Sequence, residues 1–170
     1  MCIRDRLPTE VLGGALGEAA TLAAVSSGLA REGIPREHPR HAPLTKRLGR
    51  FVRGAWLAGR VARGATLHRE LTFAIHVPIG DAAGEGRALL RGAMDLVVVT
   101  DDEVAVIDYK RARGPGLEPY GFQLELYVLA ARSLFPEART VRAGVVFLGG
   151  DPETPLWLPE AASEGLASRV

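Results

Sequence analysis

Three strand-like segments joined by short links constrain the fold of this 170-residue chain more than any other feature. The segments read LTFAIHVPI, ALLRGAMDLVVVT and VAVIDYK, and they are rich in the β-branched and aromatic residues that favour strands. We expect the first strand at about 70–77, a turn at DAAGEGR and a tight turn at DDE. Parallel strands need a crossover of about a dozen residues or more, so these short links predict an antiparallel meander.

Helical patterns lie on both sides of this meander. An alanine- and leucine-rich helix is expected at 9–32 and an amphipathic helix at 44–62, separated by the proline-marked loop GIPREHPRHAP. A third helix is expected at 120–134, followed by the apolar strand VRAGVVFLGG. The tail after Asp151 contains three prolines and is expected to be a loop or a sheet edge. This order of elements, α-α-β-β-β-α-β, predicts an α/β fold with a mixed sheet flanked by helices.

The chain divides into three expected parts. These are a basic helical flank at 1–66, an α/β core at 67–150 and a tail at 151–170. The opening MCIRDR shows no pattern that ties it to the rest of the sequence, and we assign it no structural role. A chain of this length can form one domain with a substantial core.

Composition excludes several classes of protein. No apolar run approaches about 18 residues, and the charged N-terminus does not resemble a signal peptide, so we expect no membrane partner. The single cysteine, Cys2, excludes a disulfide framework, a zinc knuckle and a four-cysteine iron–sulfur cluster within this chain. The chain also lacks a GxxxxGK[ST] loop, so no nucleotide site is expected. A cytoplasmic location is the natural expectation.

Basic residues gather in one stretch. From Arg31 to Arg69 the chain has ten arginines and lysines against two acids, a net charge of +8, whereas the whole chain carries +1. The remainder is therefore acidic. Such asymmetry suits a polyanion that is held by a basic flank around an acidic, metal-binding site, although a solvated arginine-rich helix would give the same pattern.

Two carboxylates interrupt apolar strands. Asp95 follows GAM and precedes LVVV, and Asp108 ends VAVI. Both lie six or seven residues from the intervening turn, so a hairpin places them at the same height, where a divalent cation would relieve their repulsion. Lys110 lies two residues after Asp108, on the same face of the strand. This arrangement suits metal-assisted hydrolysis of a phosphodiester.

The choice of lysine supports this interpretation. Nineteen of the 21 basic residues are arginine, and only Lys46 and Lys110 are lysine. A compact point charge beside a reacting phosphate is a role for which lysine is better suited than the larger guanidinium group.

The segments together resemble the core of the PD-(D/E)XK nuclease superfamily, and specifically its RecB/AddA-like branch. The matching pieces are RELTFAI, LLRGAMDLVVV, VAVIDYK and YGFQLELYVLAA. A D-x-K triplet alone is common by chance, but four segments in the right order are specific. The resemblance implies a restriction-endonuclease-like sheet with an αβββαβ core.

The resemblance also assigns roles to residues. It implies that Asp95 and Asp108 bind Mg²⁺ or Mn²⁺ and that the backbone carbonyl of Tyr109 adds a ligand. Lys110 would serve the attacking water, and Glu70 would complete or orient the metal site. The residues expected to contact DNA or support the site are Arg111, Tyr120, Gln123 and Tyr127.

The implied function is metal-dependent hydrolysis of DNA, most simply as an exonuclease in recombination or double-strand-break repair beside a helicase. One departure bears on it: the family usually carries a histidine in an earlier GxxxH segment, and none precedes residue 44. Either the chain is a fragment of a helicase–nuclease, or it does without this ligand. The alternatives are a catalytically silent DNA-binding or scaffold domain and a stand-alone restriction- or phage-type endonuclease.

Each candidate also has a purely structural interpretation. Asp95 could pair with a neighbouring arginine such as Arg91, and Asp108 with Lys110 could form a surface pair. Gln123 and Tyr127, one helical turn apart, could simply pack, and Glu70 could be solvated. The remaining expectations concern other residues. The histidines, including His38 and His41 in the proline-rich loop, are expected at the surface, and Phe51 and Trp56 in the core.

Overall fold

The computed structural model describes residues 17–79, 86–114, 116–150 and 153–159. Four of the segments named from the sequence lie wholly or partly outside these ranges: MCIRDR, the expected helical start at 9–16, most of the DAAGEGR turn and the end of the tail. The described elements are α2 (Glu18–Arg31), α3 (His41–Arg53), α4 (Ala55–Ala62), β1 (Thr66–Ile79), β2 (Gly86–Val99), β3 (Glu103–Lys110), the 3₁₀ turn η2 (Glu118–Tyr120), α5 (Gly121–Leu134), β4 (Thr140–Phe147) and β5 (Leu156–Trp157).

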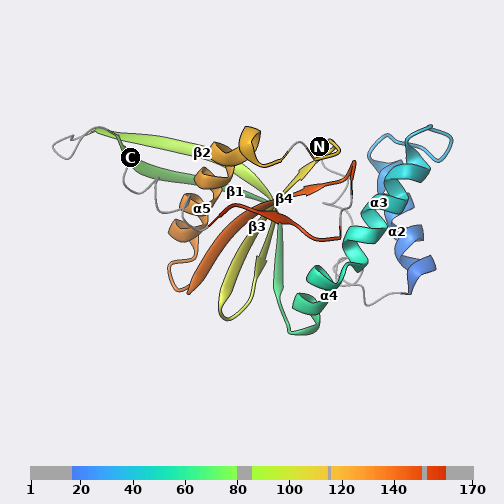
Figure 1. Ribbon diagram of the computed structural model, residues 1–170, viewed down its shortest axis with the longest axis horizontal. Helices are drawn as coiled ribbons and strands as arrows, with labels where there is room; N and C mark the ends of the chain where they lie inside the picture. The colour runs from blue at the N-terminus through green and yellow to red at the C-terminus, as the bar shows by residue number, and fades with distance from the viewer. Residues whose placement is uncertain (1–16, 80–85, 115, 151–152, 160–170) are drawn as a thin grey trace.

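The strands form one mixed five-stranded sheet in the order β1-β2-β3-β4-β5. Strands β1, β2 and β3 pair antiparallel, which confirms the predicted meander. Strand β4 pairs parallel with β3, and α5 lies in the connection between them, as a crossover requires. Strand β5 adds antiparallel to β4, so the start of the tail is the sheet edge. The mixed sheet flanked by helices is therefore the α/β fold that the sequence predicted (Figure 1).

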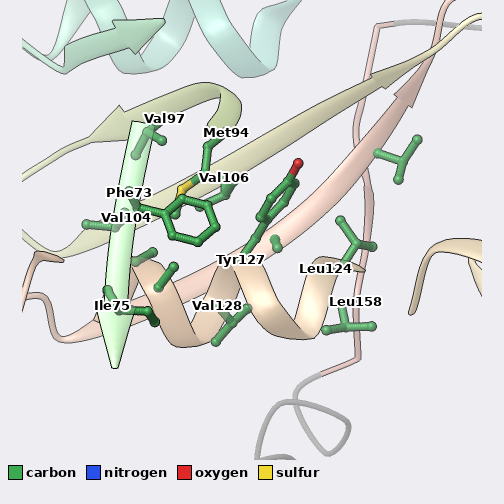
Figure 2. Close-up of a cluster of buried hydrophobic side chains, with 14 of the residues drawn as sticks. Phe73, Ile75, Met94, Val97, Val104, Val106, Leu124, Tyr127, Val128 and Leu158 are labelled. Carbon is green, nitrogen blue, oxygen red and sulfur yellow. The ribbon is translucent and has the colours of Figure 1, made fainter. Parts of the chain in front are cut away.

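Two layers of apolar side chains cover the two faces of the sheet. Strand β3 shows the division, because its successive residues point to opposite faces. Val104 and Val106 pack with Leu124 of α5 in one cluster, shown in Figure 2. Ala105 and Ile107 belong to a second cluster with the buried residues of α2, α3 and α4. The basic N-terminal helices therefore share a hydrophobic core with the sheet.

The predicted helix at 44–62 is wrong as a single element. The helix begins earlier, at His41, and is interrupted at Gly54, which has ψ 139° between α3 and α4. A Cβ atom at Gly54 would lie 2.8 Å from the backbone oxygen of Glu153. The chain changes direction at a residue without a side chain because a distant segment passes against it, which helical periodicity alone does not reveal.

The expectation of a surface position is wrong for His41. Its side chain is 5% exposed, and its Nε2 lies 2.8 Å from the hydroxyl of Ser26 on α2. Its Nδ1 lies 2.7 Å from the carbonyl oxygen of Ile34, a partner that accepts only, so Nδ1 carries the proton. The ring therefore joins α2, the following loop and the start of α3. Phe51 is buried as expected, and Trp56 packs against the same core.

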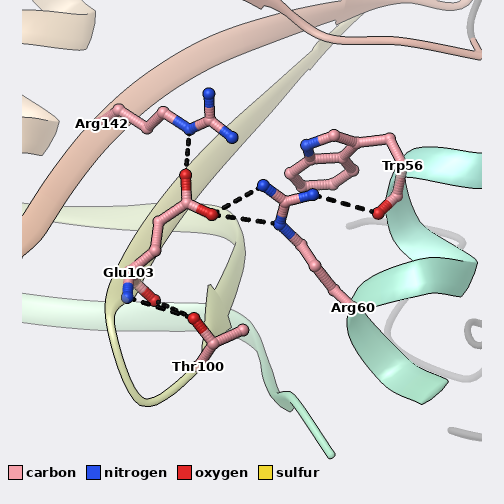
Figure 3. A network of polar contacts seen from close by, with 5 residues as sticks. All are labelled: Trp56, Arg60, Thr100, Glu103 and Arg142. Carbon is pink, nitrogen blue, oxygen red and sulfur yellow. Dashed lines mark hydrogen bonds and ion pairs between the residues drawn. The ribbon is translucent and has the colours of Figure 1, made fainter. Parts of the chain in front are cut away.

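A polar network attaches α4 to the sheet (Figure 3). Arg60 Nη2 lies 2.6 Å from the Glu103 carboxylate, and the guanidinium of Arg60 stacks 4.4 Å from the Trp56 ring centroid. The other carboxylate oxygen of Glu103 forms an ion pair with Arg142 on β4. Thr100 Oγ1 accepts a hydrogen bond from the Glu103 backbone N–H (3.1 Å). One partly buried carboxylate thus joins α4, β3 and β4.

Strand β1, with 14 residues, is longer than predicted, and β2, also with 14 residues, begins two residues earlier than predicted. In Figure 1 the two strands extend as a hairpin beyond the rest of the sheet. Their alternation changes phase in the middle. On β1, Leu67 packs in the cluster under α2–α4, whereas Leu71 packs in the cluster under α5. On β2, Met94 and Leu96 divide in the same way. Residues an even number apart should share a face, so both strands switch faces around Glu70 and Asp95.

Candidate active site

The end of β3 carries a buried ion pair. Asp108 is 3% exposed, and its Oδ2 lies 2.7 Å from Lys110 Nζ. The two side chains lie on the same face of β3, as strand alternation predicted. The ammonium of Lys110 also lies 4.8 Å from the ring centroid of Tyr120, just before α5. A buried carboxylate is stable only when it is paired, and Lys110 provides the counter-charge here.

Gln123 on α5 joins both members of this pair. Its Oε1 accepts a hydrogen bond from Lys110 Nζ (3.1 Å), and its Nε2 donates to Asp108 Oδ1 (3.1 Å). Nε2 also donates to the Tyr127 hydroxyl (2.8 Å), which in turn donates to the carbonyl oxygen of Ala93 on β2 (3.0 Å). Only an amide offers both the acceptor and the two donors that this position uses. Gln123 and Tyr127 therefore do more than pack.

Asp95 lies on the neighbouring strand, opposite Asp108. The last paired residues of β2 and β3 are Leu96 and Ile107, and one further step in the same register reaches Asp95 and Asp108. Asp95 Oδ2 accepts a hydrogen bond from the backbone N–H of Tyr109 (2.8 Å). The N–H and C=O of one strand residue point to the same side, so the carbonyl of Tyr109 also faces β2. The carboxylates of both aspartates thus lie at the end of the β2–β3 ladder.

Glu70 extends this row to a third strand. On β1 and β2 the pairs Arg69–Leu96 and Leu71–Met94 flank it, and the same register places Glu70 opposite Asp95. Glu70 has φ 48°, the single left-handed conformation of a residue other than glycine in the described parts of the chain. Such a conformation costs about 1–2 kcal/mol per residue. The strained residue lies where both strands change face, opposite Asp95 in the register.

The electrostatics of Tyr127 reflect the negative charges of three acids on neighbouring strands. Burial raises the pKa of the Tyr127 phenol, the hydrogen bond from Gln123 lowers it, and the negative charges of Asp108, Asp95 and Glu70 raise it further. Figure 2 shows the ring of Tyr127 projecting from α5 among the apolar side chains of the sheet, with its hydroxyl at the edge of that cluster. The negative charges of acids on three strands therefore raise the pKa of one phenol.

The donor atoms at this site suit a hard divalent cation. Two carboxylates and a backbone carbonyl offer oxygen ligands of the kind that Mg²⁺ and Mn²⁺ prefer. Within the described residues, no three His, Cys, Asp or Glu side chains gather as a ready ligand set. The chemistry of the donors thus fits the ion, with two aspartates rather than a complete protein cage, and Mg²⁺ commonly keeps several waters in such sites.

The remaining predicted residues divide between the site and its surroundings. The ring of Tyr120 contacts the ammonium of Lys110, whereas Arg111 is exposed and lines a groove beside α3. Sequence reasoning placed Phe51 in the core but missed its partner, the ring of Tyr109, which it meets edge-on at 5.1 Å. It also missed the carbonyl of Ala93, because backbone acceptors leave no signal in a sequence.

In the described ranges, no helix combines the length and the apolar character needed to cross a membrane.

The similarities of this chain to known proteins are of three kinds. The chain is 28% identical over 132 residues to an ATP-dependent helicase/nuclease subunit of Oenococcus oeni; this match covers 72% of the chain but 11% of that protein's length. The crystal structure of SSO0001 aligns with 98% of the chain and 70% of its own length, at a TM-score of 0.39 and 19% identity. The family model of the PD-(D/E)XK nuclease superfamily matches residues 6–165. With the acids and the lysine in this arrangement and a family match over nearly its whole length, the chain belongs to the PD-(D/E)XK nuclease superfamily.

Proposed function

We propose that this chain hydrolyses phosphodiester bonds of DNA with Mg²⁺ or Mn²⁺, and that the site is the end of the β2–β3 ladder. The observation that carries the proposal is the buried Asp108 carboxylate, held by Lys110 and Gln123 opposite Asp95. Burying a carboxylate together with an ammonium and an amide costs desolvation free energy. Buried polar clusters of this kind are often found at functional sites.

Each residue then has a role. Asp95, Asp108 and the Tyr109 carbonyl would hold the cation, which would supply activation of water and neutralise charge on the scissile phosphate. Lys110 donates to the attacking water and offsets negative charge in the transition state. Gln123 and Tyr127 keep Lys110 and Asp108 in place. Glu70 orients the site from β1.

The biological setting is part of the proposal. The chain spans about a tenth of the curated relative that it matches, and that relative is a helicase/nuclease protein by name. We propose that this chain acts as an exonuclease with a helicase, within the same polypeptide or as a partner, in recombination or double-strand-break repair in the cytoplasm.

The first experiment measures degradation of labelled linear single- and double-stranded DNA with Mg²⁺, with Mn²⁺ and with EDTA. Wild type should cut with either metal, and Asp108→Asn should cut at least about 100-fold more slowly, because the neutral amide is a poor metal ligand. Asp101→Asn, in the exposed β2–β3 turn, is the matched control and should cut like wild type. Cutting that persists in EDTA or in Asp108→Asn would contradict the proposal.

Closed circular DNA separates the exonuclease from the endonuclease. An exonuclease leaves the circle intact and degrades it after one linearising cut, whereas a restriction- or phage-type endonuclease opens it directly. A folded wild-type protein that cuts neither form would instead support the silent alternative. The observation that favours this alternative is that no three His, Cys, Asp or Glu side chains gather as a ready ligand set among the described residues.

A further inference from the structure

A basic groove runs along α3 to the end of β3, on the face of the sheet opposite α5. One hollow of about 550 Å³ is lined by Arg40, Arg47, Arg111 and Leu148, with Glu32 as its one acid. A second hollow of about 510 Å³ is lined by Lys46, Arg50 and Gly149. The two hollows share Pro43 and Arg47, so they form one continuous surface.

The charges of this groove differ from those of the neighbouring arginines. Arg53 pairs with Glu18, and Arg50 with Glu153. In contrast, the side chains of Arg40, Lys46, Arg47 and Arg111 have no acidic group within 4 Å among the described residues. Four cations without counter-charges repel one another unless an anion lies between them. The groove is therefore suited to a polyanion.

The groove begins one residue from the candidate active site. Arg111 directly follows Lys110, and Leu148, which lines the groove, donates its backbone N–H to the Lys110 carbonyl (2.8 Å). Alternation places the Lys110 side chain on the α5 face, so the site and the groove meet at the carboxyl end of β3 from opposite faces.

The position of α3 is fixed rigidly at this point. Phe51 of α3 is 1% exposed and meets Tyr109 edge-on. Arg47 lies one helical turn before Phe51, on the same side of the helix. The backbone of Gly149 lies close against the segment that follows Lys110, because a Cβ there would collide with the carbonyl oxygen of Ala112. Packed contacts on either side of the groove thus position the backbone that carries Arg47 and the backbone that carries Arg111.

From this arrangement we infer that the groove binds the sugar–phosphate backbone of the DNA strand whose scissile phosphate lies at Asp108 and Lys110. This inference rests on the proposed nuclease function. The groove offers charge but few flat aromatic surfaces, so binding is independent of base sequence. A strand that crosses the end of β3 contacts Lys110 on one face and Arg111 with Arg47 on the other.

The test measures DNA affinity in EDTA, apart from cleavage, for R47Q/R111Q and for the control R63Q/R132Q. Arg63 and Arg132 are exposed and lie outside the groove, and the control loses the same charge. The groove variant should bind a single-stranded oligonucleotide about tenfold more weakly, and the slope of log K against log salt should fall by about 1.4 for two lost phosphate contacts on a single strand. The control should bind within about twofold of wild type.

A small ester separates this inference from the nuclease proposal. Bis(p-nitrophenyl) phosphate needs the metal site but not the groove, so wild type and the control R63Q/R132Q should both hydrolyse it in Mn²⁺. Equal DNA affinity of R47Q/R111Q and the control would overturn the groove while leaving the nuclease intact. Absence of hydrolysis in every protein would instead overturn the nuclease, and the affinities would still test the groove. The inference would also be overturned if R47Q/R111Q bound a labelled polyglutamate peptide more weakly than wild type but bound DNA with unchanged affinity.

Discussion

The carboxylate of Asp95 on β2 accepts a hydrogen bond from the backbone N–H of Tyr109 on β3, at 2.8 Å. The regular pairing of these strands ends one step earlier, at Leu96 and Ile107. A side chain therefore replaces the next backbone bond of the ladder. This contact holds the Asp95 carboxylate at the end of the β2–β3 ladder, beside Asp108.

This contact gives Asp95→Asn and Asp95→Ala different consequences. The amide oxygen of asparagine can still accept from Tyr109, so Asp95→Asn should lower the free energy of unfolding in EDTA by less than about 0.5 kcal/mol. Asp95→Ala leaves the backbone N–H of Tyr109 without this partner and should lower the free energy of unfolding by about 1–3 kcal/mol. Both variants should lose the rise in melting temperature that Mg²⁺ produces by binding the folded wild type.

Urea denaturation and thermal melts with and without Mg²⁺ measure these effects. Asp101→Ala, in the exposed turn, is the control and should keep both the stability and the Mg²⁺ response. An unchanged Mg²⁺ response in Asp95→Asn would remove Asp95 from the metal site.

Tyr127→Phe tests the hydrogen-bond chain through α5. The hydroxyl joins Gln123 to the Ala93 carbonyl, and its loss should lower the free energy of unfolding by about 1–3 kcal/mol at pH 7. Burial and the three acids raise the pKa of this phenol in the folded state above its ordinary value of 10.0. An acid whose folded pKa is raised contributes stability below its unfolded pKa and loses it as pH rises through the folded pKa.

Wild type should therefore lose stability between pH 10 and pH 11 more steeply than Tyr127→Phe. Urea denaturation at pH 9, 10 and 11 compares the two proteins. The other tyrosines remain in both, so the difference reports Tyr127 alone. A constant difference across this range would show that Tyr127 ionises at its ordinary pH.

Glu103→Gln tests the network that attaches α4 to the sheet. Glu103 is 19% exposed and holds Arg60 and Arg142, which are 13% and 30% exposed. Removing the charge leaves two partly buried guanidinium groups without their shared counter-charge, and the free energy of unfolding should fall by about 1–3 kcal/mol. The matched control is Asp102→Asn, whose pair with Arg139 spans 3.9 Å at 77% and 83% exposure. Asp102→Asn should lower the free energy of unfolding by less than about 0.5 kcal/mol. If chemical denaturation gave equal losses for Asp102→Asn and Glu103→Gln, the network would not stabilise the attachment of α4.

Gly54→Ala tests the break between α3 and α4. A methyl group there meets the Glu153 carbonyl at 2.8 Å, closer than van der Waals contact, so unfolding free energy should fall by about 1–3 kcal/mol. Gly59→Ala is the control inside α4, where the nearest atom is Arg63 Nη1 at 3.6 Å. Better helix propensity should make that variant more stable by about 0.5–1 kcal/mol. If Gly54→Ala raised the melting temperature as Gly59→Ala does, the Glu153 carbonyl would not limit the side chain at position 54.

Local sequence determined much of this protein. Short links between β-rich segments required an antiparallel meander, and the helix before β4 allowed the parallel pair. Counting from the β2–β3 turn placed Asp95 opposite Asp108, because hairpin register follows from residue number. Alternation likewise placed Lys110 beside Asp108. These features depend on neighbours in the chain, which the sequence contains directly.

Only the tertiary structure decided the rest. The interruption at Gly54 depends on Glu153, about a hundred residues away, and the burial of His41 depends on Ser26 and Ile34. The change of face at Glu70 and Asp95 breaks the period of two, because two faces of one hairpin must cover two different cores. Such contacts form between residues far apart in sequence and through backbone atoms that all residues share, so no local pattern records them.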